Sequence, residues 1–86
     1  MILALDIGNT NIVIGCMEKD KAYFVERVST NSSKTELEYV VDFKTLLDLY
    51  QIKMDNITGC IVASVVPPLN NIVTSALKKL LHVTPL

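Results

Sequence analysis

The sequence predicts a mixed α/β fold in which three antiparallel strands are followed by alternating helices and strands. Two short runs rich in β-branched residues are separated by a Gly-Asn-Thr turn, which is typical of a β-hairpin. Two later segments carry apolar residues at helical spacing, with a nearly continuous apolar run between them. The predicted order is therefore β-β-β-α-β-α-(β), with right-handed crossovers joining the later, parallel strands.

The first hairpin has its turn at Gly8, Asn9 and Thr10. Glycine and asparagine reach positive φ at low cost, so we expect Gly8 and Asn9 to form the reversal. The second run, residues 12–17, is apolar on both alternating sets and is expected inside the sheet. The third run, residues 22–28, is interrupted by charged residues, which favours an edge position.

The first helix begins near a capping box formed by Thr35 and Glu38, although Ser33 and Glu36 offer a competing one. One face of this helix is apolar at helical spacing: Tyr39, Val40, Phe43, Leu46, Leu47 and Tyr50. We expect that face to pack in the core.

Residues 57–66 form a long apolar run, the pattern of a strand that is covered on both faces. Pro67 and Pro68 end this strand and suit the start of a helix. The second helix has the most regular stripe in the chain: Leu69, Ile72, Val73, Ala76, Leu77 and Leu80. His82, after two lysines, is expected to cap this helix, and residues 83–86 begin another extended piece.

Composition narrows the function classes. The chain has 86 residues, half of them apolar and a fifth charged, as expected for one globular domain or part of one. The net charge of −1 and the lack of a basic cluster argue against nucleic-acid binding. No apolar run approaches the roughly 18 residues of a membrane span. Cys16 and Cys60 fit buried reduced thiols, and we expect a cytoplasmic protein.

Asp6 lies just before the Gly8-Asn9-Thr10 turn. Such a turn exposes backbone N–H groups and the Thr10 hydroxyl, which together suit a phosphate. A carboxylate about 4 Å from a phosphate costs roughly 4 kcal/mol at an effective dielectric near 20. Mg²⁺ between the two removes this repulsion, since Mg²⁺ binds carboxylates, waters and substrate phosphates. The alternative is a plain hairpin in which Asp6 only closes the first strand.

Two motifs carry a resemblance to a known family. The first is Asp6-Ile7-Gly8-Asn9-Thr10-Asn11 at the start of the chain, and the second is Ser64-Val65-Val66-Pro67 after a later strand. Together they resemble the type III pantothenate kinases, which belong to the actin/hexokinase/Hsp70-like ATPase superfamily. The resemblance implies a ribonuclease H-like half-domain, with residues 1–86 forming the incomplete N-terminal subdomain and the second domain absent.

The resemblance also implies roles for residues. The expected ATP and phosphate site comprises Asp6, Ile7, Gly8, Asn9, Thr10, Asn11, Ile12 and Val13. Asp6 would hold Mg²⁺ through water. The floor of the cleft would be lined by Ser64, Val65, Val66 and Pro67, although a plain strand end is the alternative there. The general base, the pantothenate contacts and the site for K⁺ or NH₄⁺ are expected downstream of Leu86, so no catalytic residue is assigned here.

Three functions remain open at this point. The chain is the N-terminal part of a type III pantothenate kinase, or part of another kinase or phosphatase of the superfamily. The third possibility is a non-catalytic regulatory relative that resembles the Bvg accessory factors, which act as transcriptional activators. Alone, the chain is expected to be inactive and to form a homodimer or associate with the missing C-terminal part.

Overall fold

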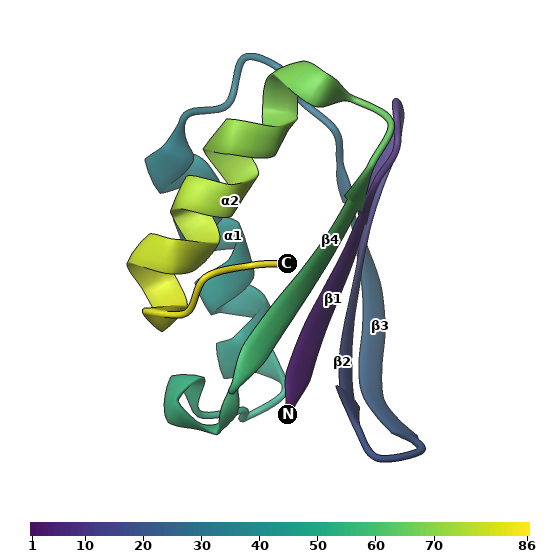
Figure 1. Cartoon of the computed structure of the whole chain (residues 1–86), viewed down its shortest axis with the longest axis vertical. Coiled ribbons are helices and arrows are strands. Elements are labelled where there is room, and N and C mark those ends of the chain that lie inside the picture. The colour runs from purple at the N-terminus through teal and green to yellow at the C-terminus, as the bar shows by residue number, and fades with distance from the viewer.

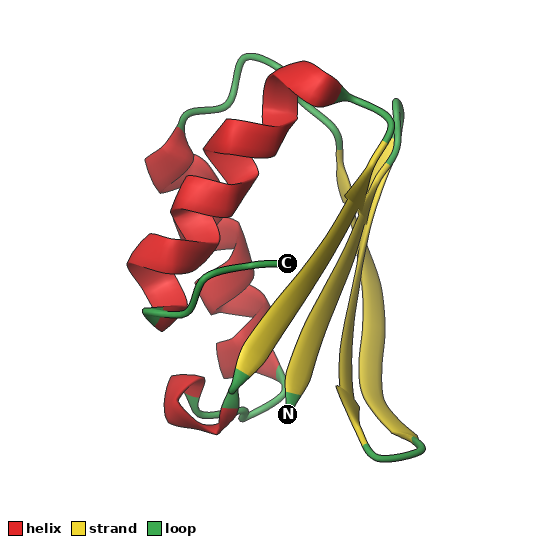
Figure 2. Cartoon of the chain, viewed as in Figure 1, coloured by secondary structure: helices red, strands yellow, loops and turns green.

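A computed structural model describes residues 1–86, the whole chain. Its elements, in order, are β1 (Ile2–Ile7), β2 (Asn11–Glu18), β3 (Lys21–Ser29), α1 (Glu36–Leu49), a 3₁₀ turn η1 (Met54–Asn56), β4 (Gly59–Ser64) and α2 (Pro67–Leu81). The strands form one mixed sheet in the order β3-β2-β1-β4, with β1 antiparallel to β2 and parallel to β4 (Figure 2). This confirms the predicted mixed α/β class, and β3 lies at an edge as expected.

Both helices pack on the same face of the sheet (Figure 1). Alternate residues of each strand point to that face, because successive side chains of a strand lie on opposite sides. Leu3, Leu5 and Ile7 of β1 are buried there, as are Ile12 and Ile14 of β2. From the helices, the core receives Tyr39, Phe43, Leu47, Leu69, Val73, Ala76, Leu77, Leu80 and Leu81. The apolar stripe predicted for the second helix is confirmed as the main helical contribution to this core.

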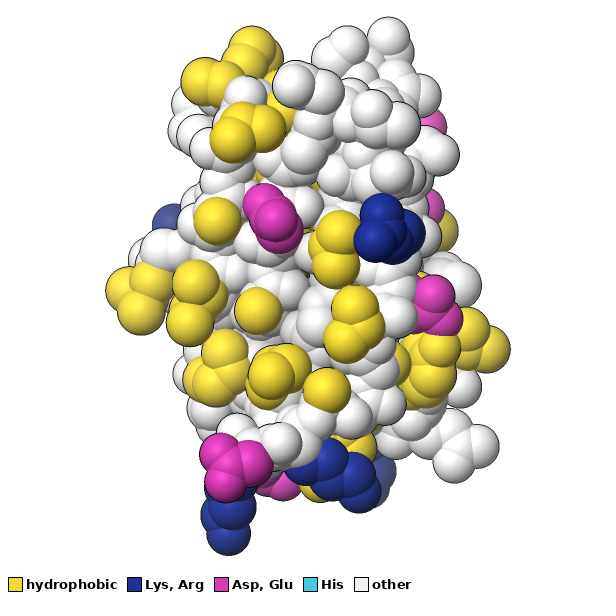
Figure 3. All heavy atoms as spheres, turned by 90° about the vertical axis from the view of Figure 1, so that its right-hand side faces the viewer, with side chains coloured by type: hydrophobic (Ala, Val, Ile, Leu, Met, Phe, Trp, Pro, Cys, Tyr) yellow, Lys and Arg dark blue, Asp and Glu magenta, His cyan; other side chains and the backbone are white.

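The other face of the sheet is open, which corrects the expectation that the fourth strand is covered on both sides. Ile61 of β4 is 51% exposed, and Val25 of β3 is 61% exposed. Figure 3 looks onto this face and shows groups of apolar side chains on it, with a few charged side chains between them and more charges at the lower end. The apolar run of residues 57–66 does not show which segment packs on the second face of the sheet. Neither helix of this chain reaches that face. We call this surface the open sheet face.

The extended piece predicted after the second helix lies along the free edge of β4. The Leu86 N–H donates to the Cys60 carbonyl, and the Val62 N–H donates to the Leu86 carbonyl, both at 2.9 Å. One residue bonding on either side of Ile61 is the pattern of a parallel neighbour. Leu86 therefore lies beside β4 in the place of a residue on a parallel neighbouring strand.

The helix ends follow local sequence signals. Thr35 is the N-cap of α1 and forms the capping box with Glu38, which settles the choice between the two candidate boxes. Proline occupies the first turn of α2, and His82 is its C-cap in the left-handed conformation. Neither helix is long and apolar enough to cross a bilayer.

Three connections meet at one end of the sheet: the β1–β2 loop, the β3–α1 segment and the β4–α2 junction (Figure 1). This follows from the topology, because β1, β3 and β4 all run toward that end. Both sequence motifs therefore lie at the same edge.

Candidate functional site

The connection between β1 and β2 is the short segment Gly8 to Thr10, which we call the phosphate loop. The Gly8 N–H closes the loop by donating to the Asn11 carbonyl oxygen at 2.9 Å. The expectation of positive φ at Gly8 and Asn9 is wrong, because neither residue adopts it. Glycine is favoured for a different reason: a Cβ at Gly8 would lie 3.1 Å from the Asn11 carbonyl oxygen.

The phosphate loop presents free hydrogen-bond donors. Asn9 and Thr10 are exposed, and neither backbone N–H donates to a protein acceptor. The hydroxyl of Thr10 and the amide of Asn9 also have no protein partner. Backbone N–H groups that stay unpaired in a turn are available to donate to an anion. The loop is therefore chemically suited to a phosphate group.

Asp6 is the second-last residue of β1, two positions before Gly8, and its side chain lies on the open sheet face. Its Cα partners are Val13 on β2 and Ala63 on β4, so it sits on the central strand of the sheet. The carboxylate is exposed, and no ion pair includes it. The chain has no cluster of three or more metal-ligating side chains, and Asp6 is the carboxylate nearest to the loop in the sequence. One carboxylate with phosphates and waters is a typical Mg²⁺ environment.

The second motif lies beside the first. Ser64 is the Cα partner of Ile7, and the Val65 N–H donates to the Ile7 carbonyl oxygen at 3.0 Å. The Ser64 hydroxyl accepts the Val66 N–H at 3.0 Å, which turns the chain into α2 at Pro67. The structure thus brings the two motifs together at the carboxyl ends of β1 and β4, where ligands of open α/β sheets bind.

Some of the predicted site residues turn away from the loop. The side chains of Ile7 and Ile12 are fully buried in the core, so only their backbone atoms remain available to a ligand. Asn11 and Val13 belong to β2 and are half-buried. The two surface hollows of the chain lie at the opposite end of the sheet, beside η1 and at the β2–β3 turn. The phosphate loop is therefore an open surface in this chain.

The sequence motifs did not point to Thr30 as a residue of the site. Thr30 directly follows β3 and donates two hydrogen bonds to the phosphate loop. The strand register is the feature that could have identified Thr30: Asn11 pairs with Ser29, which places the residue after Ser29 opposite Thr10.

Comparison with known proteins decides the family. Residues 2–86 match the family model described as type III pantothenate kinase. The chain belongs to the type III pantothenate kinase family. This confirms the resemblance drawn from the two motifs.

Named members of this family align with the whole chain. The type III pantothenate kinase of Halalkalibacterium halodurans is 37% identical over 86 residues, covering all of this chain and 34% of that protein. That of Finegoldia magna is 38% identical over 86 residues, covering all of this chain and 33% of that protein. That of Brevibacillus brevis is 46% identical over 70 residues, covering 81% of this chain and 28% of that protein. The chain thus spans about a third of the length of the curated relatives it matches.

Proposed function

We propose that this chain is the N-terminal, phosphate-binding part of a kinase that transfers the ATP γ-phosphate to pantothenate, the first step of coenzyme A biosynthesis. One observation carries the proposal: the loop that holds the free N–H groups of Asn9 and Thr10 begins two residues after the unpaired carboxylate of Asp6, in a chain of this family. The fold is proposed to be the ribonuclease H-like half-domain of the actin-like ATPases, which the sheet order and the crossover from β3 through α1 to β4 support.

The residues of the phosphate loop hold the phosphates by donation. The backbone N–H groups of Asn9 and Thr10 and the Thr10 hydroxyl face solvent, where phosphate oxygens can accept from them. Each hydrogen bond to a charged acceptor contributes about 1.5–3 kcal/mol. Phosphoryl transfer depends mainly on positioning and on charge stabilisation, so a rigid set of donors is the main requirement.

Asp6 is proposed to orient the waters of Mg²⁺. Bound Mg²⁺ supplies positive charge that neutralises the phosphates. The carboxylate fits this role because it is exposed on the sheet face next to the loop and makes no ion pair. Ser64 and Val65 are proposed to line the floor of the cleft, which their hydrogen bonds along β1 and into α2 support. Val66 and Pro67 would continue this floor into the helix.

The remaining parts of the enzyme are proposed to lie outside residues 1–86, in a second domain. These parts are the general base, the pantothenate contacts and a site for K⁺ or NH₄⁺. The open sheet face supports this proposal, because large apolar surfaces mark contacts with another segment or chain. A homodimer, or association with the C-terminal part of the protein, is proposed for this chain, in the cytoplasm and with no nucleic-acid or membrane partner.

The test is ADP release by a polypeptide of the relatives' full length that begins with this chain. We expect turnover with pantothenate, Mg²⁺ and K⁺ or NH₄⁺, and none with a panel of sugars and small alcohols. Preference for a sugar, or indifference to the monovalent cation, would assign the protein to another kinase of the superfamily. Absence of any turnover would favour the regulatory alternative.

Asp6→Asn in the same polypeptide tests the metal role. We expect kcat to fall by at least about 100-fold, because the amide keeps the size of the side chain but loses its charge. The thermal midpoint should stay within a few degrees of wild type. Asp20→Asn is the matched control, since Asp20 is exposed in the β2–β3 turn at the other end of the sheet. A normal kcat for Asp6→Asn would leave Asp6 as a strand-ending residue only.

A further inference from the structure

Thr30 makes two hydrogen bonds that span the phosphate loop. Its hydroxyl donates to the Gly8 carbonyl oxygen at 2.7 Å, and its backbone N–H donates to the Thr10 carbonyl oxygen at 2.9 Å. These acceptors are the first and last residues of the loop. Thr30 is half-buried, so water competes less for these bonds than at a fully exposed position.

The bond to Gly8 has a consequence for Asn9. The two residues share one planar trans peptide, in which the carbonyl and the N–H point in opposite directions. Because the Gly8 carbonyl points to the Thr30 hydroxyl, the Asn9 N–H must point away from Thr30. That N–H is one of the two free donors of the loop. Without the hydroxyl, this peptide loses the contact that fixes its orientation.

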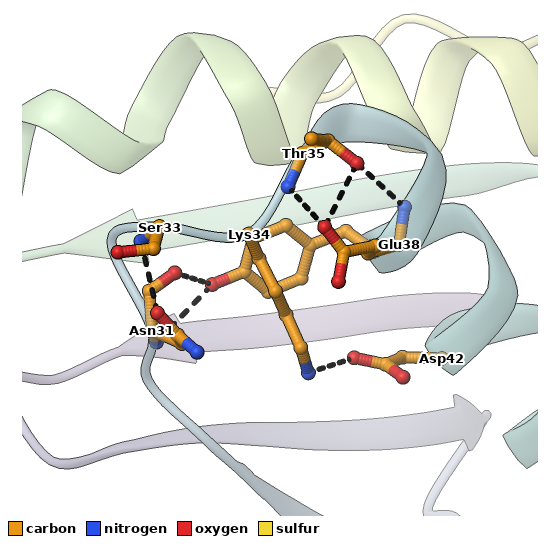
Figure 4. A network of polar contacts seen from close by, with 7 residues as sticks. Asn31, Ser33, Lys34, Thr35, Glu38 and Asp42 are labelled. Atoms are coloured by element: carbon orange, nitrogen blue, oxygen red, sulfur yellow. Dashed lines mark hydrogen bonds and ion pairs between the residues drawn. The ribbon is translucent and has the colours of Figure 1, made fainter.

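Thr30 is in turn held by helix α1 through the next residue. The Tyr39 hydroxyl donates to the Asn31 carbonyl oxygen at 2.9 Å and accepts the Asn31 N–H at 3.4 Å. The ring of Tyr39 is fully buried, so its hydroxyl is a fixed point. Lys34 pairs with Asp42 at 2.6 Å across the same segment (Figure 4). The segment between β3 and α1 is therefore anchored at both ends.

We propose that Thr30 is a positioning residue that sets the Gly8–Asn9 peptide so that the Asn9 N–H faces the nucleotide phosphate. This role rests on the proposed function of the phosphate loop. Thr30 itself need not touch the nucleotide, because both of its bonds go to carbonyl groups on the inner side of the loop.

The test uses a ¹⁵N-labelled polypeptide of the relatives' full length that begins with this chain, titrated with Mg·ATP and followed by amide chemical shifts. Thr30→Val keeps the branched shape and the backbone N–H but removes the hydroxyl. We expect its dissociation constant to rise about 3- to 10-fold, the effect of losing one neutral hydrogen bond. The Asn9 amide shift should also change in the free chain. Thr30→Ser keeps the hydroxyl and should bind within about twofold of wild type.

Thr58→Val is the matched control. The Thr58 N–H and hydroxyl both donate to the Met1 carbonyl oxygen, at 2.9 and 3.3 Å, so this threonine makes similar bonds at the other end of β1. We expect it to leave the dissociation constant and the Asn9 shift unchanged. A purely structural effect of removing a threonine hydroxyl would appear in both valine variants.

Two outcomes overturn the proposal in different ways. If wild type binds Mg·ATP at the loop and Thr30→Val binds equally tightly, or Thr30→Ser does not restore binding, the positioning role is wrong while the proposed function stands. If Mg·ATP moves neither the Asn9 nor the Thr10 amide of wild type, the proposed function fails, and the role of Thr30 fails with it.

Discussion

Gly8 and Gly15 should respond in opposite directions to the same substitution. Neither has positive φ, so replacing either with alanine causes no backbone strain. Their surroundings differ. An added Cβ at Gly8 would lie 3.1 Å from the Asn11 carbonyl oxygen, whereas at Gly15 the nearest atom would be the Phe24 carbonyl oxygen at 3.8 Å. The first distance is a steric conflict and the second is an ordinary contact.

The expected free energies follow from these distances. Alanine lowers the conformational entropy of the unfolded chain, which stabilises a compatible site by about 0.4–1 kcal/mol. Gly15→Ala should gain this amount. Gly8→Ala gains it as well, but pushes away the carbonyl that accepts the Gly8 N–H at 2.9 Å. Losing that bond costs about 0.5–1.5 kcal/mol, slightly more than the gain, so the variant should be about 0.3 kcal/mol less stable than wild type.

Urea unfolding of the two variants measures the difference. With a slope near 1 kcal/mol per molar for a small domain, their midpoints should differ by about 1 M. Gly15→Ala should lie above wild type and Gly8→Ala below it. If Gly8→Ala is stabilised as much as Gly15→Ala, the close approach of the Asn11 carbonyl is not what favours glycine in the loop.

Three further predictions concern the core and the anchor of the β3–α1 segment. In urea melts, Tyr39→Phe should lower the free energy of unfolding by about 1–2 kcal/mol, because its hydroxyl bonds both backbone groups of Asn31. The control Tyr23→Phe, at an exposed ring, should change this free energy by less than about 0.5 kcal/mol. Leu77→Ala should cost about 2–5 kcal/mol by the same measurement, and a smaller cost would mean that α2 is loosely packed. Burial raises the pKa of the Cys60 thiol from 9.0 to about 11. The neutral buried thiol therefore contributes its full stabilisation of the folded state below pH 9, and this contribution is lost as the pH rises to about 11. In wild type the free energy of unfolding should fall by about 2–3 kcal/mol across that pH range, and Cys60→Ala should remove this fall. An unchanged pH profile would show that the thiol is accessible in the folded chain.

The fold was largely predictable because its signals are local. The stripe of α2, the capping box at Thr35 and the charged edge strand each follow from residues close in sequence. The covering of β4 was not predictable from its apolar run, since that run is the same whether a helix of this chain or another segment packs on it. Only the arrangement of α1 and α2 on one face reveals the open sheet face.

The site was predictable as a pair of motifs but not as a geometry. The motifs meet because Ile7 pairs with Ser64 in the parallel ladder of β1 and β4, a pairing that the predicted order of elements did not specify. The preference for glycine at position 8 comes from the Asn11 carbonyl oxygen, three residues away. A positive φ would favour glycine equally, so the residue type alone does not tell the two reasons apart. Thr30 lies 22 positions from Gly8, so its bond arises from strand register and has no local pattern.

The central claim is that the phosphate loop and Asp6 together bind a metal–nucleotide complex. Mn²⁺·ATP in place of Mg·ATP measures this most directly, because the paramagnetic ion broadens amide signals near it. We predict selective broadening at Asp6, Asn9 and Thr10, and its loss in Asp6→Asn. Broadening centred on the β2–β3 turn around Asp20, or broadening that persists in Asp6→Asn, would contradict the account.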